Sequence, residues 1–237
     1  MKVISFAFIG LTIVCLALLA KLLFDATDKS NLEASKKNRI KVRVFALFIL
    51  WAIFVSVWSV SGKMGDFKMF PLNMAPVLIV PMIGILYFTF ARSTQPIIAN
   101  LSQTNIIALQ SFRVIVEILL WRLFALNEMP VQMSFEGKNW DVLSGLTAIA
   151  VAFFVSKNKV GKNILVIWNL LGLALLINIV TIAILSMPTT SRVFMNEPAN
   201  TIVTQFPISL LPGFLVPLAY GLHFLSLRNL AISKPNK

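Results

Sequence analysis

One segment in the middle of the chain carries ionisable side chains within an apolar stretch. Residues 105–126 are mostly isoleucine, leucine and phenylalanine, but they include Gln110, Arg113, Glu117 and Trp121. At 100° per residue these four fall within roughly 80° of one another on a helix. Each charge near a bilayer centre costs roughly 3 kcal/mol on insertion scales, and such residues commonly serve a function. The stripe predicts a polar site for a solute, a lipid headgroup or a proton, and a purely structural ion pair is the alternative.

Polar residues of two later apolar stretches are expected at a similar depth. With a rise of about 1.5 Å per residue, Glu117 lies near the bilayer midplane and Arg113 one turn deeper. Asn169 lies about 10 Å and His223 about 7 Å from the inner surface by the same measure. We therefore expect Gln110, Arg113, Glu117, Asn169 and His223 to converge in the inner half of a helix bundle. For His223 alone, a packing role is the alternative.

A polar loop between the fourth and fifth apolar stretches offers three more candidates: Glu136, Asn139 and Asp141. Asn139 and Asp141 are good N-cap residues for the helix that follows, and Trp140 suits the headgroup interface. The alternative is an extracellular lid on which Glu136 and Asp141 contact a ligand. The second long outer loop, residues 188–206, would then cover the same mouth.

Signatures of enzymes, metals and cofactors are scarce. The single histidine excludes an HExxH zinc motif, and neither a Walker A loop nor a GxGxxG stretch occurs. Ser144 and His223 have the side chains of a serine–histidine dyad. We expect them roughly 15–20 Å apart in depth, whereas a dyad needs about 3 Å. We therefore expect no metal and no cofactor, and an intramembrane enzyme acting on lipid is the least favoured function.

The composition places these residues in a membrane. Of the 237 residues, 58% are hydrophobic and 13% are charged, whereas soluble domains average about 25% charged. A globule of this size cannot hide so many apolar side chains, and the long continuous apolar stretches favour helices over barrel strands. The net charge of +12 resides largely on short loops. We therefore expect the lipid bilayer as the partner, and no nucleic acid.

The apolar stretches predict an all-α, polytopic membrane protein that is one transmembrane domain over residues 1–237. Seven stretches can cross a bilayer core of about 30 Å, which takes about 20 helical residues. Thirteen bases lie on the side of the C-terminus and five on the other side. The positive-inside rule then places the C-terminus in the cytoplasm and the N-terminus outside. The predicted spans are Val3–Phe24, Val44–Gly62, Leu72–Ala91, Asn105–Leu126, Trp140–Ser156, Asn163–Met187 and Ile208–Leu227.

Two predicted spans share a pattern. Residues 70–92 and 206–228 align without gaps with eight identities, and they hold six of the eleven prolines in identical spacings. Both run inward, so we predict a parallel repeat of residues 1–92 and 140–228, joined by a linker helix at 105–126. This 3+1+3 layout resembles that of the SWEET sugar carriers at the level of fold alone. Two kinked helices without common descent are the alternative.

The repeated prolines carry a structural expectation of their own. Each removes an N–H donor and clashes with the carbonyl four residues back. Three in one span should break or kink its outer half. Carbonyl groups freed in this way are tolerated only where protein or water covers them. We therefore expect spans 3 and 7 to lie inside the bundle, with bends that line a cavity.

From Gln110 to His223 the chain resembles an uncharacterised family of bacterial seven-span membrane proteins. The resemblance covers about half of the chain. It implies a location in the bacterial inner membrane and no assigned activity. The residues that carry it are Phe112-Arg113 with Glu117, the run Phe135-Glu136-Gly137-Lys138-Asn139-Trp140-Asp141, Trp168-Asn169, Pro188-Thr189 and the span with Pro207, Pro212 and Pro217.

These observations favour a secondary transporter of a small solute or lipid. In this hypothesis Glu117 carries a proton or cation, Arg113 binds an anion or acts as counter-ion, and the prolines permit gating. The alternative is a membrane sensor or an assembly or scaffold protein that binds a partner through its outer loops. An oligomer is compatible with both.

Overall fold

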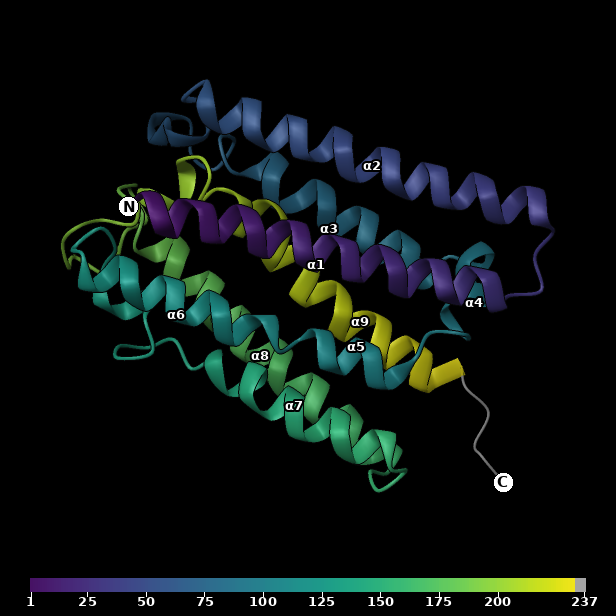
Figure 1. Ribbon diagram of the computed structural model, residues 1–237. Helices are drawn as coiled ribbons and strands as arrows, with labels where there is room; N and C mark the ends of the chain where they lie inside the picture. The colour runs from purple at the N-terminus through teal and green to yellow at the C-terminus, as the bar shows by residue number, and fades with distance from the viewer. Residues whose placement is uncertain (233–237) are drawn as a thin grey trace.

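The structure is a bundle of helices that run back and forth between the same two ends (Figure 1). A computed structural model describes residues 1–232, and every regular element in that range is helical. We call the end that holds Met1 the N-terminal end and the end that holds Ile232 the C-terminal end. The helices are α1 (Lys2–Lys29), α2 (Ala34–Val60), α3 (Ala75–Phe90), α4 (Gln95–Ile98), α5 (Gln103–Leu109), α6 (Phe112–Ala125), α7 (Val142–Ser156), α8 (Lys162–Leu185) and α9 (Val216–Ile232).

Short helical turns connect or extend these helices. A π-helical turn, η6 (Leu211–Leu215), leads directly into α9. The 3-10 turns are Lys63–Gly65, Phe67–Met69, Arg92–Thr94, Val131–Met133 and Ile202–Thr204.

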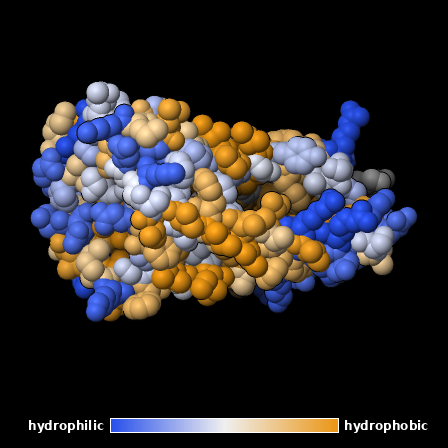
Figure 2. Space-filling model, turned by 90° about the horizontal axis from the view of Figure 1, so that it is seen from above, coloured by the Kyte–Doolittle hydropathy of each residue, from blue (hydrophilic) through white to orange (hydrophobic). Residues whose placement is uncertain are grey.

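The surface of the bundle is compatible with a membrane location. Within residues 1–232, four helical stretches are long and apolar enough to cross a membrane: α1, α2, α8 and Leu211–Ile232. Helix α3 and the segment Arg92–Ile98 form a fifth if the two are counted as one span, although the chain bends by 65° between them. Figure 2 shows hydrophobic side chains around the middle of the molecule and hydrophilic ones at both ends. Exposed apolar residues on this scale, such as Val57 and Leu171, are expected where lipid covers a protein.

All seven predicted spans contain helix, and the fourth is divided. Gln110 and Ser111 form a turn between α5 and α6. There the amide of Arg113 donates to the Gln110 carbonyl at 3.2 Å and that of Val114 to the Ser111 carbonyl at 3.1 Å. These i→i+3 bonds tighten the chain where an α-helix would have i→i+4 bonds. The irregular backbone therefore lies immediately before the arginine of the polar stripe.

Helix α3 does not behave as its prolines predicted. Only Val77 and Thr89 are buried in it, so the expectation that span 3 lies inside the bundle is wrong. Pro76 lies in the first turn, where the missing N–H group would have no helical partner in any case. Pro81 lies within α3 without ending it. The three prolines of this segment therefore shape the start of the helix more than its course.

Span 7 does lie inside the bundle. Of its most apolar window 56% is buried, and α9 packs against α3, α5 and α8 (Figure 1). Pro217 cannot donate to the carbonyl of Gly213 four residues earlier. The indole Nε1 of Trp51 in α2 donates to that carbonyl at 2.8 Å instead. The chain thus covers a freed carbonyl with protein, and it widens the preceding turn into the π-helix η6.

The two proline-rich segments begin alike. Pro76 and Pro212 each follow the first residue of their helical stretch, and turns precede both stretches. Helices α3 and α9 also pack against each other. Common descent of the two halves stays a prediction.

Candidate functional site

A buried ion pair joins span 4 to the start of α7. Arg113 and Asp141 are only 2% and 5% exposed. The guanidinium Nε donates to Asp141 Oδ2 at 2.7 Å, and Nη2 pairs with Oδ1. This two-pronged contact is the strongest geometry available to arginine and a carboxylate. Arg113 is therefore neutralised by a residue from the loop, and not by Glu117 on its own helix.

The same guanidinium reaches the only histidine. Arg113 Nη1 lies 3.0 Å from His223 Nε2, and His223 Nδ1 lies 2.9 Å from Asn169 Oδ1. Because arginine can only donate, Nε2 accepts and the imidazole is neutral, with its proton on Nδ1 donated to Asn169. Asn169 Nδ2 in turn donates to Ser226 Oγ at 2.8 Å, and Gln103 Nε2 donates to the same hydroxyl at 2.5 Å. A continuous polar chain thus runs from α5 through α9, α8 and α6 to α7.

Glu117 belongs to this assembly through Asn139. It is 2% exposed, and its Oε2 accepts from Asn139 Nδ2 at 2.6 Å. Asn139 Oδ1 accepts the backbone amide of Asp141 at 3.0 Å. Asn139 therefore holds the second carboxyl group of the site and also orients the partner of Arg113.

Gln110 ties the break in span 4 to α9. Its Nε2 donates to the Ala219 carbonyl at 3.2 Å, and the side chain is 1% exposed. Its Oε1 is buried without a hydrogen-bond partner among residues 1–232. The turn between α5 and α6 is thereby fixed against the central helix.

The loop between α6 and α7 folds into the N-terminal end of the bundle. Met129 and Met133 in this loop are buried in the main core, and Gln132 Nε2 donates to Ser186 Oγ at 2.9 Å. Asn178 in α8 donates to the Lys138 carbonyl at 3.0 Å. Because Asn178 lies about 10 Å before the end of α8, the loop reaches well below that end and carries its polar residues to Glu117 and Arg113.

Two glycines allow the close packing around this network. A Cβ atom at Gly145 in α7 would lie 2.8 Å from the backbone nitrogen of Val114. A Cβ atom at Gly172 in α8 would overlap the His223 imidazole. On another side, the Trp168 ring lies 5.4 Å from that imidazole between centroids. The imidazole is therefore confined by α8 as well as by its two hydrogen bonds.

A small cavity lies beside the charged residues. Its volume is about 80 Å³, and its walls include Arg113, Glu117 and Asp141. Met133 of the first long loop and Val203 of the second also line it, and the rest of its wall is apolar. A cavity of this size has room for a few water molecules. The residues that bear two carboxyl groups and one guanidinium thus line a space that both loops cover at the N-terminal end.

The structure brings together all five residues predicted for the intramembrane site, but their depths and pairing differ. The estimate of 15–20 Å between the levels of Ser144 and His223 is wrong, because Arg113 contacts both His223 and Asp141, three residues before Ser144. Helix α9 continues to Ile232, which leaves His223 about 13 Å from the end of its helix. Both His223 nitrogens have other partners, and this argues against a dyad with Ser144.

The three loop candidates have two different fates. Asn139 and Asp141 join the buried network. Asp141 is the N-cap residue of α7, as one of the two predictions had it, but its side chain makes no capping hydrogen bond. Glu136 lies elsewhere and accepts from Trp121 Nε1 at 2.6 Å. Trp121 is therefore engaged with the loop, away from the ion pair.

Some members of the network gave little sign in the sequence. Ser226 and Gly172 are small residues in apolar stretches, and Gln103 precedes the predicted fourth span. The helix ends needed to compare their heights are known only from the structure. For the network as a whole, the usable signal in the sequence was the expected depth of Asn169 and His223 along their spans.

The chain belongs to a family described as a domain of unknown function (DUF8737), whose profile matches residues 69–231. The matched region includes every residue of the network and both proline-rich segments, and it leaves out α1 and α2. No curated protein and no solved structure matches the chain.

We expect Asp141→Asn to destabilise the protein by about 3–5 kcal/mol, because it leaves Arg113 buried without a counter-charge. Thermal unfolding in detergent measures this. Glu197→Gln is the matched control: it breaks the pair of the exposed Glu197 with Arg192, and a pair with one partner in solvent is worth at most about 1 kcal/mol. Equal melting temperatures for the two variants would show that the buried pair does not hold the loop.

We expect Gly172→Ala to lower stability by about 1–3 kcal/mol, because the added methyl group displaces the His223 ring. Gly10→Ala is the control: a Cβ atom there meets nothing within 4 Å, and alanine in a helix is worth about 0.5–1 kcal/mol over glycine. The melting temperature should fall for the first variant and stay or rise for the second. If the melting temperatures of both variants changed in the same direction by the same amount, the close contact between Gly172 and His223 would be contradicted.

Proposed function

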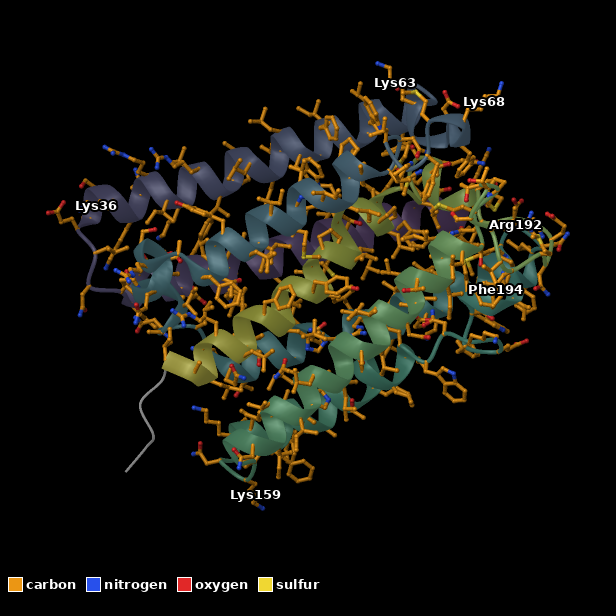
Figure 3. The ribbon with its side chains drawn as sticks, turned by 180° about the vertical axis from the view of Figure 1, so that it is seen from behind. Lys36, Lys63, Lys68, Lys159, Arg192 and Phe194 are labelled. Atoms are coloured by element: carbon orange, nitrogen blue, oxygen red, sulfur yellow. The ribbon has the colours of Figure 1, made fainter. Side chains whose placement is uncertain are left out.

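We propose that this protein is a bacterial inner-membrane protein that crosses the bilayer seven times, with its N-terminus outside and its C-terminus in the cytoplasm. The alternating course of the helices and the hydrophobic belt support this proposal. So does the charge distribution, because basic side chains occur at both ends (Figure 3) but are more numerous on loops at the C-terminal end. The resemblance to bacterial seven-span proteins agrees with it.

Cysteine labelling tests this topology in a Cys15→Ala background. Lys36→Cys and Lys159→Cys should react with a membrane-impermeant maleimide only after the membrane is permeabilised. Lys63→Cys and Lys68→Cys should react in intact cells, because they lie at the opposite end of the bundle (Figure 3). All four positions are exposed, so their reactivity reports on sidedness. Labelling of all four from one side would overturn the seven crossings.

We propose further that the protein is a secondary transporter of a small solute or lipid, driven by a proton that Glu117 takes up and releases. The observation that carries this proposal is the charge balance among Arg113, Glu117 and Asp141, which lie together beside the cavity of about 80 Å³. Arg113 neutralises Asp141 through both of its carboxylate oxygens. The carboxyl group of Glu117 is left to be balanced by a proton or another cation, because buried charges are paired or neutralised.

The hydrogen bonds of Glu117 connect such a proton to the loop. Asn139 donates to the Glu117 carboxylate and accepts from the amide of Asp141. A proton on Glu117 removes the charge that strengthens the first of these bonds. The loop that covers the cavity would then be held less firmly, and it would open toward the N-terminal end. In this scheme Arg113 is the counter-ion that keeps Asp141 in place, and the break at Gln110 and Ser111 permits movement within span 4.

Proton flux in proteoliposomes tests the role of Glu117. Vesicles loaded with a pH-sensitive dye are exposed to a panel of small organic anions, cations and sugars. The wild type should acidify or alkalinise the lumen with at least one solute, and Glu117→Gln should remove at least about 90% of that flux, which corresponds to about 1.4 kcal/mol. Glu33→Gln, at the exposed start of α2, should transport normally. Equal solute-dependent flux with Glu117→Gln would refute the role.

The second candidate is a sensor or assembly protein that binds a partner at the N-terminal end. The observation that favours it is the exposure of apolar residues on both long loops there, with Trp140 at 58%, Val193 at 62% and Met195 at 67%. Because Trp140 lies between Asn139 and Asp141, a partner that contacts it would act directly on the buried network. If this second candidate is right, affinity purification should yield a stable complex with a partner, and the proteoliposomes should show no solute-dependent proton flux.

A further inference from the structure

A second and larger cavity lies outside the charged network. Its volume is about 570 Å³, within the range of roughly 300–1,000 Å³ that is usual for ligand pockets. It is enclosed by α1, α2, α3 and the stretch from η6 into α9, and its wall is almost wholly apolar, with Leu19, Phe48, Trp51, Gly84, Phe88 and Leu222 among its residues. The side of the molecule in Figure 2 is hollowed within the hydrophobic belt. The ligand that such a wall fits is a hydrocarbon chain.

Helix α2 is held to the rest of the bundle on both sides of this cavity. Near its start Lys41 Nζ pairs with Asp28 of α1 at 2.6 Å, and three further donors bind nearer its end. Trp51 Nε1 donates to the Gly213 carbonyl at 2.8 Å, Trp58 Nε1 to the Asn73 carbonyl at 2.9 Å and Ser59 Oγ to the Thr204 carbonyl at 2.7 Å. These donors all belong to the second half of α2. Only Val55 and Ser59 of the whole helix are buried. The middle of α2, from Val44 to Phe54, borders the gap against α1 and α3.

The length of the cavity matches one leaflet of a bilayer. Its lining residues in α2 run from Val44 to Phe54, which is about 15 Å along a helix. The hydrocarbon core of a bilayer is about 30 Å thick, so one lipid chain extends over about half of that distance. The cavity thus has the reach of a single acyl chain that enters from the C-terminal end.

The wall becomes polar toward that end. Thr89 is fully buried, lines the cavity, and its hydroxyl has no hydrogen-bond partner within residues 1–232. Arg92 follows the lining residue Phe88 by four positions, and Arg228 follows the lining residue Leu225 by three. Arg228 Nε is likewise buried without a hydrogen-bond partner in the described part of the chain. Arg228 therefore lies about one helical turn beyond the apolar wall, the hydroxyl of Thr89 belongs to the wall itself, and Arg92 lies in the turn that directly follows α3.

We propose that this cavity binds one acyl chain of an anionic phospholipid whose phosphate group is held by Arg92 and Arg228. The hydroxyl of Thr89 donates to the ester carbonyl of the bound chain. A zwitterionic lipid offers the same chain but no net negative charge to the two arginines. The expected ligand is therefore a lipid of the phosphatidylglycerol type, held between the DUF8737 region and the first two helices.

Native mass spectrometry of the full-length protein tests the proposal. The protein is reconstituted into vesicles of phosphatidylcholine and phosphatidylglycerol in a 3:1 ratio, extracted in mild detergent and weighed. The wild type should retain one phosphatidylglycerol. Gly84→Phe should lower retention by about tenfold, because its ring occupies the cavity. Gly10→Phe is the matched control, since a Cβ atom at either glycine meets nothing within 4 Å and Gly10 does not line the cavity.

The headgroup contacts have a separate readout. Arg92→Gln and Arg228→Gln should each reduce the preference for phosphatidylglycerol over phosphatidylcholine by about fivefold, without emptying the cavity. Melting temperatures identify any variant that is misfolded. Three results would overturn the proposal: lipid bound to Gly84→Phe as tightly as to Gly10→Phe, retention of the two lipids in their bulk ratio by the wild type, or a cavity filled by a second copy of the chain and therefore seen only in a lipid-free dimer.

Discussion

A guanidinium group in the middle of an apolar bundle is the constraint on which the rest of this structure depends. Leaving Arg113 unpaired there would cost several kcal/mol, and its own helix offers no carboxylate in direct contact. The chain meets this need by bringing Asp141 inward. To do so it folds the loop between α6 and α7 into the bundle, buries Met129 and Met133, and starts α7 next to span 4. Stability and the candidate site therefore have the same physical origin.

The same constraint sets the state of the neighbouring residues. Because Arg113 donates to His223, the imidazole is neutral and its Nδ1–H donates to Asn169 Oδ1. Because Asp141 is occupied by Arg113, Glu117 is left with Asn139 as its polar contact. The site thus contains one carboxyl group that is fixed by an ion pair and one whose partner is a neutral amide. That difference between two neighbouring acids is the basis of the proposed proton-driven transport.

The position of α2 depends on a different set of contacts. Helix α2 has few buried side chains, and indole and hydroxyl donors hold it to carbonyl groups of the bundle. Polar contacts at separate points along a helix hold it in place without closing the apolar space beside it.

Composition and hydropathy determined the helical class, because apolar stretches of this length leave the backbone no other way to satisfy its hydrogen bonds in lipid. They also predicted the neighbourhood of Arg113, Asn169 and His223, because each is costly in an apolar setting unless the others are near. The tertiary structure alone decided that Asp141 pairs with Arg113, that α3 lies at the surface and that Trp51 covers the Gly213 carbonyl. These outcomes depend on where a loop folds and where a helix ends, and both are settled by packing between distant segments, which no local pattern of residues encodes.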